Sequence, residues 1–142
     1  MTAIFTLHPQ LAADTLVVGD FPRCRLLLMN DAQYPWCILV PRIAGAKELH
    51  RLDDADQLQV LRESVALSRA MEQQFKPHKM NLAALGNMVP QLHLHHIARF
   101  RGDPAWPAPV WGKHPAQPYM QGLAEERIQQ LRQALPGLMP PE

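Results

Sequence analysis

Cysteine is scarce in this sequence, with only Cys24 and Cys37 among 142 residues. Two thiols cannot build the disulfide framework of a small secreted domain, so we expect reduced core thiols in a cytoplasmic protein. Long apolar runs are also lacking: 26–29 and 37–40 are far too short to cross a bilayer. The first residues do not combine a basic stretch with an apolar one, so we expect no secretory signal and no membrane partner.

An excess of one charge is lacking too. Fourteen Lys and Arg residues face 13 Asp and Glu residues, for a formal net charge of +1. A broad nucleic-acid interface needs clustered cations, so we expect no nucleic-acid partner, although a few dipoles and histidines suffice for one phosphate. With 47% apolar residues over this length, we expect a single domain, 1–142, with a sizeable core.

Apolar runs separated by turn formers predict the order of the elements. Five strands are predicted, at residues 15–18, 25–29, 36–40, 80–85 and 92–100. Between the third and fourth, a helix is predicted to begin at Asp53 and Asp54 and to be stopped by Pro77. This order indicates an α+β fold, an antiparallel five-stranded sheet with one long helix packed on it.

Proline and tryptophan dominate residues 103–118, which include Trp106 and Trp111. Five prolines in this stretch remove the N–H donors that a regular ladder needs. We therefore expect an ordered arm rather than a second domain, with the core at about 15–100 and the arm and a terminal helix in 101–142. Apolar residues spaced by four, three and four from Ala124 predict that helix, which Pro136 ends.

The most informative segment is 91–97, Gln-Leu-His-Leu-His-His-Ile. In a strand, Gln91, His93 and His95 would share one face, and His96 would point to the other as a packing residue. Imidazole titrates near neutral pH and can act as nucleophile, acid or base. A backbone carbonyl that accepts from one ring nitrogen would leave the other free to attack, while a second histidine donates to a phosphoryl oxygen.

The spacing alone leaves three readings of these histidines open. They are nucleophilic or acid–base groups, a His-x-His metal-ligand pair, or structural residues. Arg99, on the same face, is either an ordinary solvated side chain or a positive charge for a polyphosphate. The other histidines show no partner pattern and are expected at the surface, namely His8, His50, His78 and His114.

The segment resembles the histidine-triad motif of the HIT family, His-φ-His-φ-His-φ-φ, where φ is apolar. His93 falls on the middle histidine, the family's nucleophile, and His95 on the third. Gln91 stands where the first is expected, and His96 stands at an apolar position. The upstream runs resemble the family in order, so the similarity covers roughly residues 15–100.

The resemblance implies a homodimer that binds purine nucleotides and needs no cofactor. It implies hydrolysis or transfer at the α-phosphorus through a nucleotidyl-histidine, in which His93 attacks and His95 contacts the phosphate or helps the leaving group. Asn30 and Asp31 would hold the ribose, and Asn87 would reach the phosphates or the leaving group. These three residues also suit turns.

Gln91 is the main departure from the motif. Its carbonyl still stands where it can orient the His93 ring, but its side chain cannot exchange a proton near pH 7, so the rate or leaving-group preference should differ. The leading function is cleavage of a nucleoside phosphoramidate or dinucleoside polyphosphate, without a metal. A nucleotide-binding module with little catalysis and a His-ligated metalloprotein stay open. The resemblance implies that the C-terminal segment runs toward the partner's site, where Trp106 and Trp111 would line a pocket or the interface. Simple packing of these tryptophans in the core or the arm stays open as the alternative.

Overall fold

The computed structural model describes residues 3–141 and contains one five-stranded antiparallel sheet. Its spatial order is β1-β2-β3-β5-β4, and every neighbouring pair is antiparallel. The strands are β1 (Thr15–Asp20), β2 (Cys24–Met29), β3 (Trp36–Pro41), β4 (Lys79–Ala83) and β5 (Leu94–Arg99). The predicted α+β architecture is confirmed, because the sheet carries the long helix that the sequence predicted.

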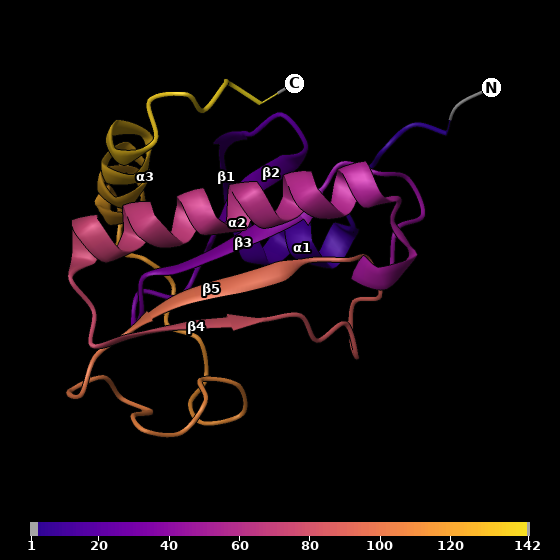
Figure 1. Ribbon diagram of the computed structural model, residues 1–142. Coiled ribbons are helices and arrows are strands. Elements are labelled where there is room, and N and C mark those ends of the chain that lie inside the picture. The colour runs from indigo at the N-terminus through magenta and orange to yellow at the C-terminus, as the bar shows by residue number, and fades with distance from the viewer. Residues whose placement is uncertain (1–2, 142) are drawn as a thin grey trace.

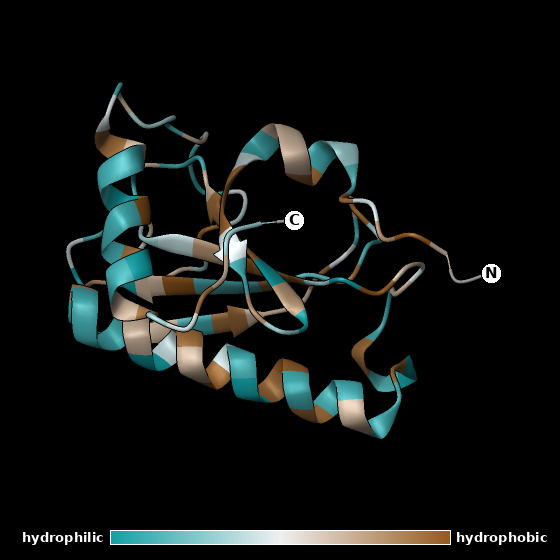
Figure 2. Cartoon of the chain, turned by 90° about the horizontal axis from the view of Figure 1, so that it is seen from above, coloured by the Kyte–Doolittle hydropathy of each residue, from teal (hydrophilic) through white to brown (hydrophobic). Residues whose placement is uncertain are grey.

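One face of the sheet is covered by α2 (Asp54–Phe75), with α3 (Leu123–Ala134) beside it (Figure 1). The Asp53 carboxylate caps α2 by accepting from the Asp56 N–H, and Lys76 ends the helix with a φ of 52° before Pro77. Figure 2 shows both helices banded in teal and brown, as expected for elements with one buried side. The buried side of α2 includes Val60, Leu67 and Met71.

The opposite face is covered by a short helix and by the C-terminal arm. Helix α1 (Pro9–Asp14) packs Leu11 into a second apolar cluster, to which the arm contributes Val110. The sequence did not predict α1, which has only six residues and is capped by the half-buried His8 side chain. Because both faces are covered, the middle strands are almost entirely buried.

One strand boundary differs from the prediction in a way that matters for the site. β5 begins at Leu94, two residues later than predicted, because the Leu92 N–H donates to the Ala46 carbonyl instead of to a neighbouring strand. Gln91 and His93 therefore lie just outside the ladder. Near Ala46, residues Leu49–Arg51 form a 3-10 turn.

No helix among residues 3–141 combines the length and the apolar character needed to cross a membrane. Cys24 and Cys37 are both buried free thiols. Burial raises the pKa of each, that of Cys37 to about 12. Both side chains belong to the core between the sheet and α2.

Candidate active site

His93 lies immediately before β5 with only 7% of its surface exposed. Its Nδ1 atom is 2.6 Å from the carbonyl oxygen of Gln91. Because a carbonyl only accepts, Nδ1 carries the hydrogen of this bond, and the neutral ring keeps a free lone pair on Nε2. The backbone thus holds His93 in the tautomer that a nucleophile requires.

His95, on β5, is held in the opposite tautomer. The indole N–H of Trp36 donates to His95 Nδ1 over 3.0 Å. An indole N–H is a donor only, so Nδ1 is unprotonated and the single hydrogen of the neutral ring lies on Nε2. The centroids of the His93 and His95 rings are 4.9 Å apart, which places a lone pair and an N–H donor on adjacent rings.

Burial is the main reason that His95 stays neutral. Loss of solvation, with repulsion from His93 and His96, lowers its pKa from 6.5 to about 3. Only 5% of its surface is exposed. At neutral pH, therefore, the ring offers a hydrogen bond from Nε2 and carries no positive charge.

His96 points to the other side of the sheet, toward α2, as expected for a packing residue. Its Nδ1–H donates to the Leu94 carbonyl over 3.1 Å, so its Nε2 accepts from the Ser64 hydroxyl at 2.7 Å. Burial lowers its pKa from 6.5 to about 4, although the bond to Leu94 opposes the shift. His96 thus joins the sheet to α2 as a neutral ring.

We expect the neutral state of His96 to make the protein labile in acid. A histidine with pKa 6.5 in the unfolded chain and about 4 in the fold makes the unfolded chain bind more protons below pH 6.5. The part of the fall in the free energy of unfolding that is due to His96 should then be on the order of 3 kcal/mol as pH drops from about 6.5 to about 4, in addition to the part due to His95. Urea denaturation across this range measures the fall. His96→Gln, which cannot be protonated there, should show a clearly smaller fall; the same slope in both proteins would refute this account.

The Gln91 side chain faces the N-terminal segment. Its Oε1 accepts from the His8 N–H at 2.8 Å, and its Nε2 donates to the Thr6 carbonyl at 2.9 Å. A carboxamide offers a donor and an acceptor together, which these two bonds require. The Gln91 backbone therefore accepts from His93 while its side chain holds residues 6–8.

Asn30 and Asp31 hold the C-terminal arm. Asp31 is buried, and its Oδ1 accepts from the Gln33 N–H, the Gln33 side chain and the Gln117 N–H, at 3.1, 3.1 and 3.3 Å. Asn30 Oδ1 accepts from the Tyr119 N–H at 3.0 Å. All three bonds to Asp31 use Oδ1 and none uses Oδ2.

The sheet register fixes how far these residues lie from the histidines. Leu27, Ile38 and His95 form one row across β2, β3 and β5. Asn30 follows Leu27 by three residues, so it lies about 10 Å along the strand direction from that row. The two groups lie toward opposite ends of the same strip of sheet.

A small cavity of about 110 Å³ adjoins His93. Gln91 and His93 line it together with Lys47 and His50. This volume is well below the several hundred Å³ typical of complete ligand pockets, so it suits a phosphate group rather than a whole nucleotide. Asn87 lies exposed on the loop after β4 and does not line this cavity.

Residues 10–102 match the HIT domain family. The chain belongs to this family. Three solved structures resemble this HIT chain to different degrees. It is 51% identical to a histidine triad protein from Marinobacter aquaeolei, with a TM-score of 0.93, covering 96% of this chain and 99% of that one.

The other two structures are more distant. The identity is 43% to a histidine triad protein from Bradyrhizobium japonicum, with a TM-score of 0.92 and coverage of 94% and 99%. A hypothetical histidine triad nucleotide-binding protein from Sulfolobus tokodaii shares the fold at 14% identity, with a TM-score of 0.66 and coverage of 87% and 85%. No curated protein matches this HIT chain.

The arm of this HIT chain packs on its own histidines. The Trp111 ring lies with its centroid 5.1 Å from His95 and 5.9 Å from Trp36, edge-on to both. The family resemblance implies that this segment runs toward the site of a partner subunit. In this chain, Trp111 packs against His95 of the same chain. His95 is thereby enclosed by aromatic rings from β3 and from the arm.

Arg99 anchors the arm, and both readings of it from the sequence were wrong. The side chain is 1% exposed, and its guanidinium donates twice to Asp103, at 2.8 and 3.0 Å. It also donates to Asn81 Oδ1 and to the Ala108 carbonyl. Arg99 is therefore neither solvated nor free to bind a polyphosphate.

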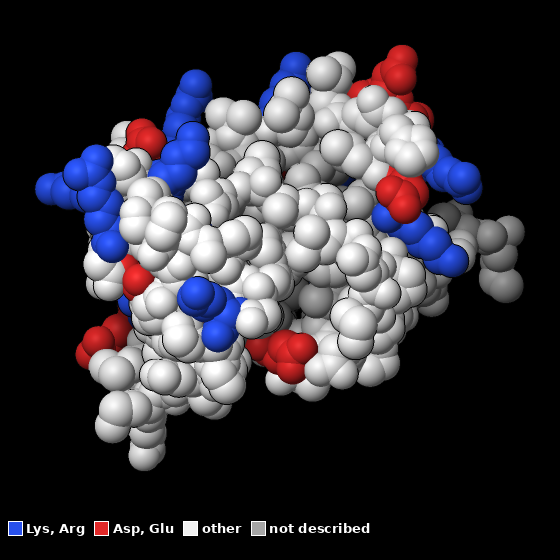
Figure 3. All heavy atoms as spheres, turned by 90° about the horizontal axis from the view of Figure 1, so that it is seen from below, with Lys and Arg blue, Asp and Glu red and all other residues white. Residues whose placement is uncertain are grey.

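The face that carries β4 and the arm is shown in Figure 3. Its centre is largely uncharged, and the Lys and Arg side chains lie mostly around its rim. Within residues 3–141, no three or more His, Cys, Asp or Glu side chains gather as a group able to hold a metal ion.

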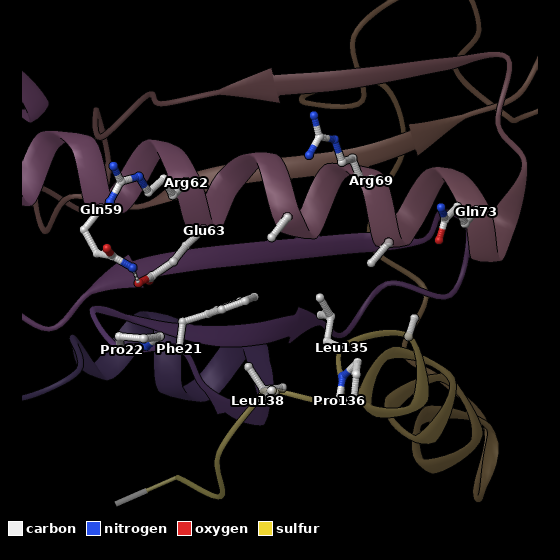
Figure 4. Close-up of a pocket in the computed structure, with 14 residues that line it drawn as sticks. Phe21, Pro22, Gln59, Arg62, Glu63, Arg69, Gln73, Leu135, Pro136 and Leu138 are labelled. Carbon is white, nitrogen blue, oxygen red and sulfur yellow. Dashed lines mark hydrogen bonds between the residues drawn. The ribbon is translucent and has the colours of Figure 1, made fainter.

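A larger cavity, about 530 Å³, lies elsewhere, between α2 and residues 134–138 (Figure 4). Glu63 points into it, but its carboxylate already accepts from the Gln59 side chain and from the N–H groups of Arg23 and Cys24. In Figure 4, the guanidinium groups of Arg62 and Arg69 point away from the apolar side chains of Phe21 and Leu135. This cavity therefore lacks a counterpart of the His93–His95 pair, in which a ring-nitrogen lone pair lies beside an N–H donor.

Proposed function

We propose that this HIT protein is a nucleotide hydrolase or transferase that cleaves at the α-phosphate of a nucleoside phosphoramidate or a dinucleoside polyphosphate. The observation that carries the proposal is the pair of fixed tautomers, a lone pair on His93 Nε2 beside a hydrogen on His95 Nε2. One group can attack phosphorus while the other stabilises charge on the phosphoryl oxygens.

The reaction proceeds in two displacements. In the first, the His93 Nε2 lone pair bonds to the α-phosphorus, and the bond to the leaving group breaks with its electron pair. In the second, water or another hydroxyl acceptor attacks the same phosphorus and loses its proton to the solvent, and the electron pair of the P–N bond returns to His93. The Gln91 carbonyl supports both steps because its bond to Nδ1 stabilises the positive charge on the modified ring.

We place the nucleotide along the sheet surface of β2, β3 and β5, between the small cavity beside His93 and the arm. The cavity beside His93 takes the phosphate, and Asp31 receives the ribose hydroxyls on Oδ2, which its bonds to Gln33 and Gln117 do not use. Asn30 orders this end through its bond to Tyr119. Asn87, on the exposed loop, contacts the departing part of the substrate.

The test is hydrolysis of a panel of adenosine compounds, assayed by release of AMP, together with calorimetric binding of AMP. Cleavage of at least one class supports the proposal. The second candidate is a binding module, favoured by the tethered Gln91 side chain, and it predicts that AMP binds while no compound is cleaved. Gln91→His would then switch on cleavage, whereas in an active enzyme this change should weaken the hold on residues 6–8.

We also propose a homodimer, supported by an apolar surface on α2 and the β4 edge. The Ser64 hydroxyl on α2 contacts His96, which lies opposite Leu82 in the β4–β5 ladder, and Leu61 and Val65 lie within one helical turn of Ser64. The remaining edge of β4 has no strand beside it among residues 3–141. The exposed apolar residues here are Leu58, Leu61, Val65, Leu82, Leu85 and Met88. A two-fold partner would cover both the surface and the open edge.

A charge at the centre of this surface should separate the subunits. We expect Leu61→Glu to weaken dimerisation by about 100-fold or more, because it places a carboxylate among apolar side chains. Sedimentation equilibrium measures the change. Leu123→Glu, at an exposed leucine in the first turn of α3, is the matched control and should stay dimeric. A monomeric wild-type protein at micromolar concentration would rule out the dimer.

We place this single-domain protein in the cytoplasm. The support is the pair of free thiols, Cys24 and Cys37, which a reducing compartment preserves. We assign the arm and α3 to the same domain, because Arg99 and Asp31 hold the arm and Arg132 of α3 donates to the Val18 carbonyl of β1.

A further inference from the structure

The bond between Trp36 and His95 limits what His95 can do in a reaction. In the neutral ring the only hydrogen is on Nε2, because Nδ1 accepts from the indole. Giving up that hydrogen would create an imidazolate anion inside a buried aromatic enclosure, which burial strongly disfavours. His95 can therefore donate a hydrogen bond but cannot transfer the proton.

We infer that Trp36 is a positioning residue that selects the leaving group, because it holds His95 as a donor that keeps its proton and so restricts the site to leaving groups that depart as anions. This inference rests on the proposed function. It selects the α–β phosphoanhydride over the phosphoramidate among the substrates proposed above.

The two bonds differ in what their cleavage requires. When His93 displaces a phosphate from a phosphoanhydride, the P–O electron pair leaves on an oxygen that is stable as an anion, so no proton is needed. When it displaces an amine from a phosphoramidate, the electron pair stays on nitrogen, which must take up a proton before or as it departs. General acid help of this kind is worth about 10²–10⁴-fold in rate.

The neighbours of His95 do not supply that proton. The titratable groups that bear on His95 are His93, which is the nucleophile, and His96, which faces α2. The Gln91 side chain does not titrate and is held by Thr6 and His8. Lys47, Glu48 and His50 line the same small cavity as His93. If one of them supplied the proton, the experiment below would find equal wild-type rates on the two substrates.

The test compares two adenosine substrates that share the α-phosphate, diadenosine tetraphosphate and an adenosine 5′-phosphoramidate of an alkylamine. For the wild-type protein at pH 7 we expect kcat/KM to favour the anhydride by about 100-fold or more. Trp36→Phe removes the indole N–H and frees Nδ1 to take a second proton. We expect the ratio in this variant to fall at least about tenfold, with phosphoramidate cleavage rising as pH falls.

Trp111→Phe is the matched control, since it removes the other indole beside His95 but leaves the bond to Trp36 in place. Its ratio should stay at the wild-type value. Nitrogen NMR of the wild-type imidazoles determines the tautomer directly, and it does not depend on whether Trp36→Phe folds. We expect hydrogen on His95 Nε2 and none on Nδ1. Hydrogen on Nδ1, or equal wild-type rates on both substrates, overturns the inference.

These outcomes are separable from failure of the proposed function. If both substrates label His93 with a nucleotidyl group at equal rates, the proposed function stands and the role of Trp36 is wrong. If neither substrate labels His93, the proposed function fails and this inference falls with it.

Discussion

His93→Ala is expected to lower kcat/KM by on the order of 10⁴-fold or more while leaving the fold intact. The variant removes the lone pair that attacks phosphorus, and no neighbouring ring replaces it, because His95 Nδ1 is engaged by Trp36 and its Nε2 carries the hydrogen. The measurement is AMP release under single-turnover conditions. Calorimetry should still detect AMP binding, because the groups that hold the ribose are unchanged.

The control for this prediction is His114→Ala. His114 is exposed on the arm, where its ring contacts the Pro104 carbonyl, and it should keep wild-type activity. Turnover by His93→Ala within about tenfold of wild type would remove His93 from the mechanism.

Asp103→Ala is expected to lower the free energy of unfolding by about 3–5 kcal/mol. The change leaves the Arg99 guanidinium buried without its paired carboxylate. It also removes the acceptor for the N–H groups of Phe100, Ala105 and Trp106, which together turn the chain into the arm. Although burial opposes ionisation, the bonds from Arg99 and from the Phe100 and Trp106 amides hold the pKa of Asp103 below its usual value.

Urea denaturation at about pH 7 measures this loss, and a partly exposed ion pair provides the comparison. Asp56 pairs with Arg23 at 2.9 Å, but the Arg23 side chain is 41% exposed, so Asp56→Ala should cost no more than about 1 kcal/mol. Equal losses in the two variants would contradict the view that Arg99 and Asp103 anchor the arm through a buried pair.

The strands and the long helix could be predicted because their signals are local. Apolar runs bounded by turn formers mark the strands, and an apolar stripe between Asp53 and Pro77 marks α2. Helix α1 has too few residues to show a period, and its cap is a histidine rather than one of the usual capping residues. Its position depends on packing against the sheet, which the sequence does not display.

The candidate site was only partly predictable for a related reason. Alternation along a strand separates His95 from His96, and the structure places these rings on opposite sides of the sheet. The partner of His95 is Trp36, 59 residues away, and the only sign of this pairing is that both residues lie in apolar strands. The prediction for Arg99 failed because Asp103 is recognisable as its partner only once the arm has folded back.

Asn30 and Asp31 illustrate the same limit. Their positions suit a turn, and their partners on the arm, Gln117 and Tyr119, lie more than 80 residues away. The Gln91 side chain likewise meets the backbone of residues 6–8 across a comparable separation. These long-range contacts decide which polar atoms remain available to a ligand.

The central claim is that His93 Nε2 forms a covalent bond to the α-phosphorus, and the direct measurement is to trap that bond. The wild-type protein would be mixed with diadenosine tetraphosphate, quenched within the first turnover in denaturant at neutral or alkaline pH, digested and mapped by mass spectrometry. The account predicts an acid-labile adenylyl group on His93 that is absent from His93→Ala. An adduct on another residue, or steady turnover with unmodified His93 throughout the first cycle, would contradict it.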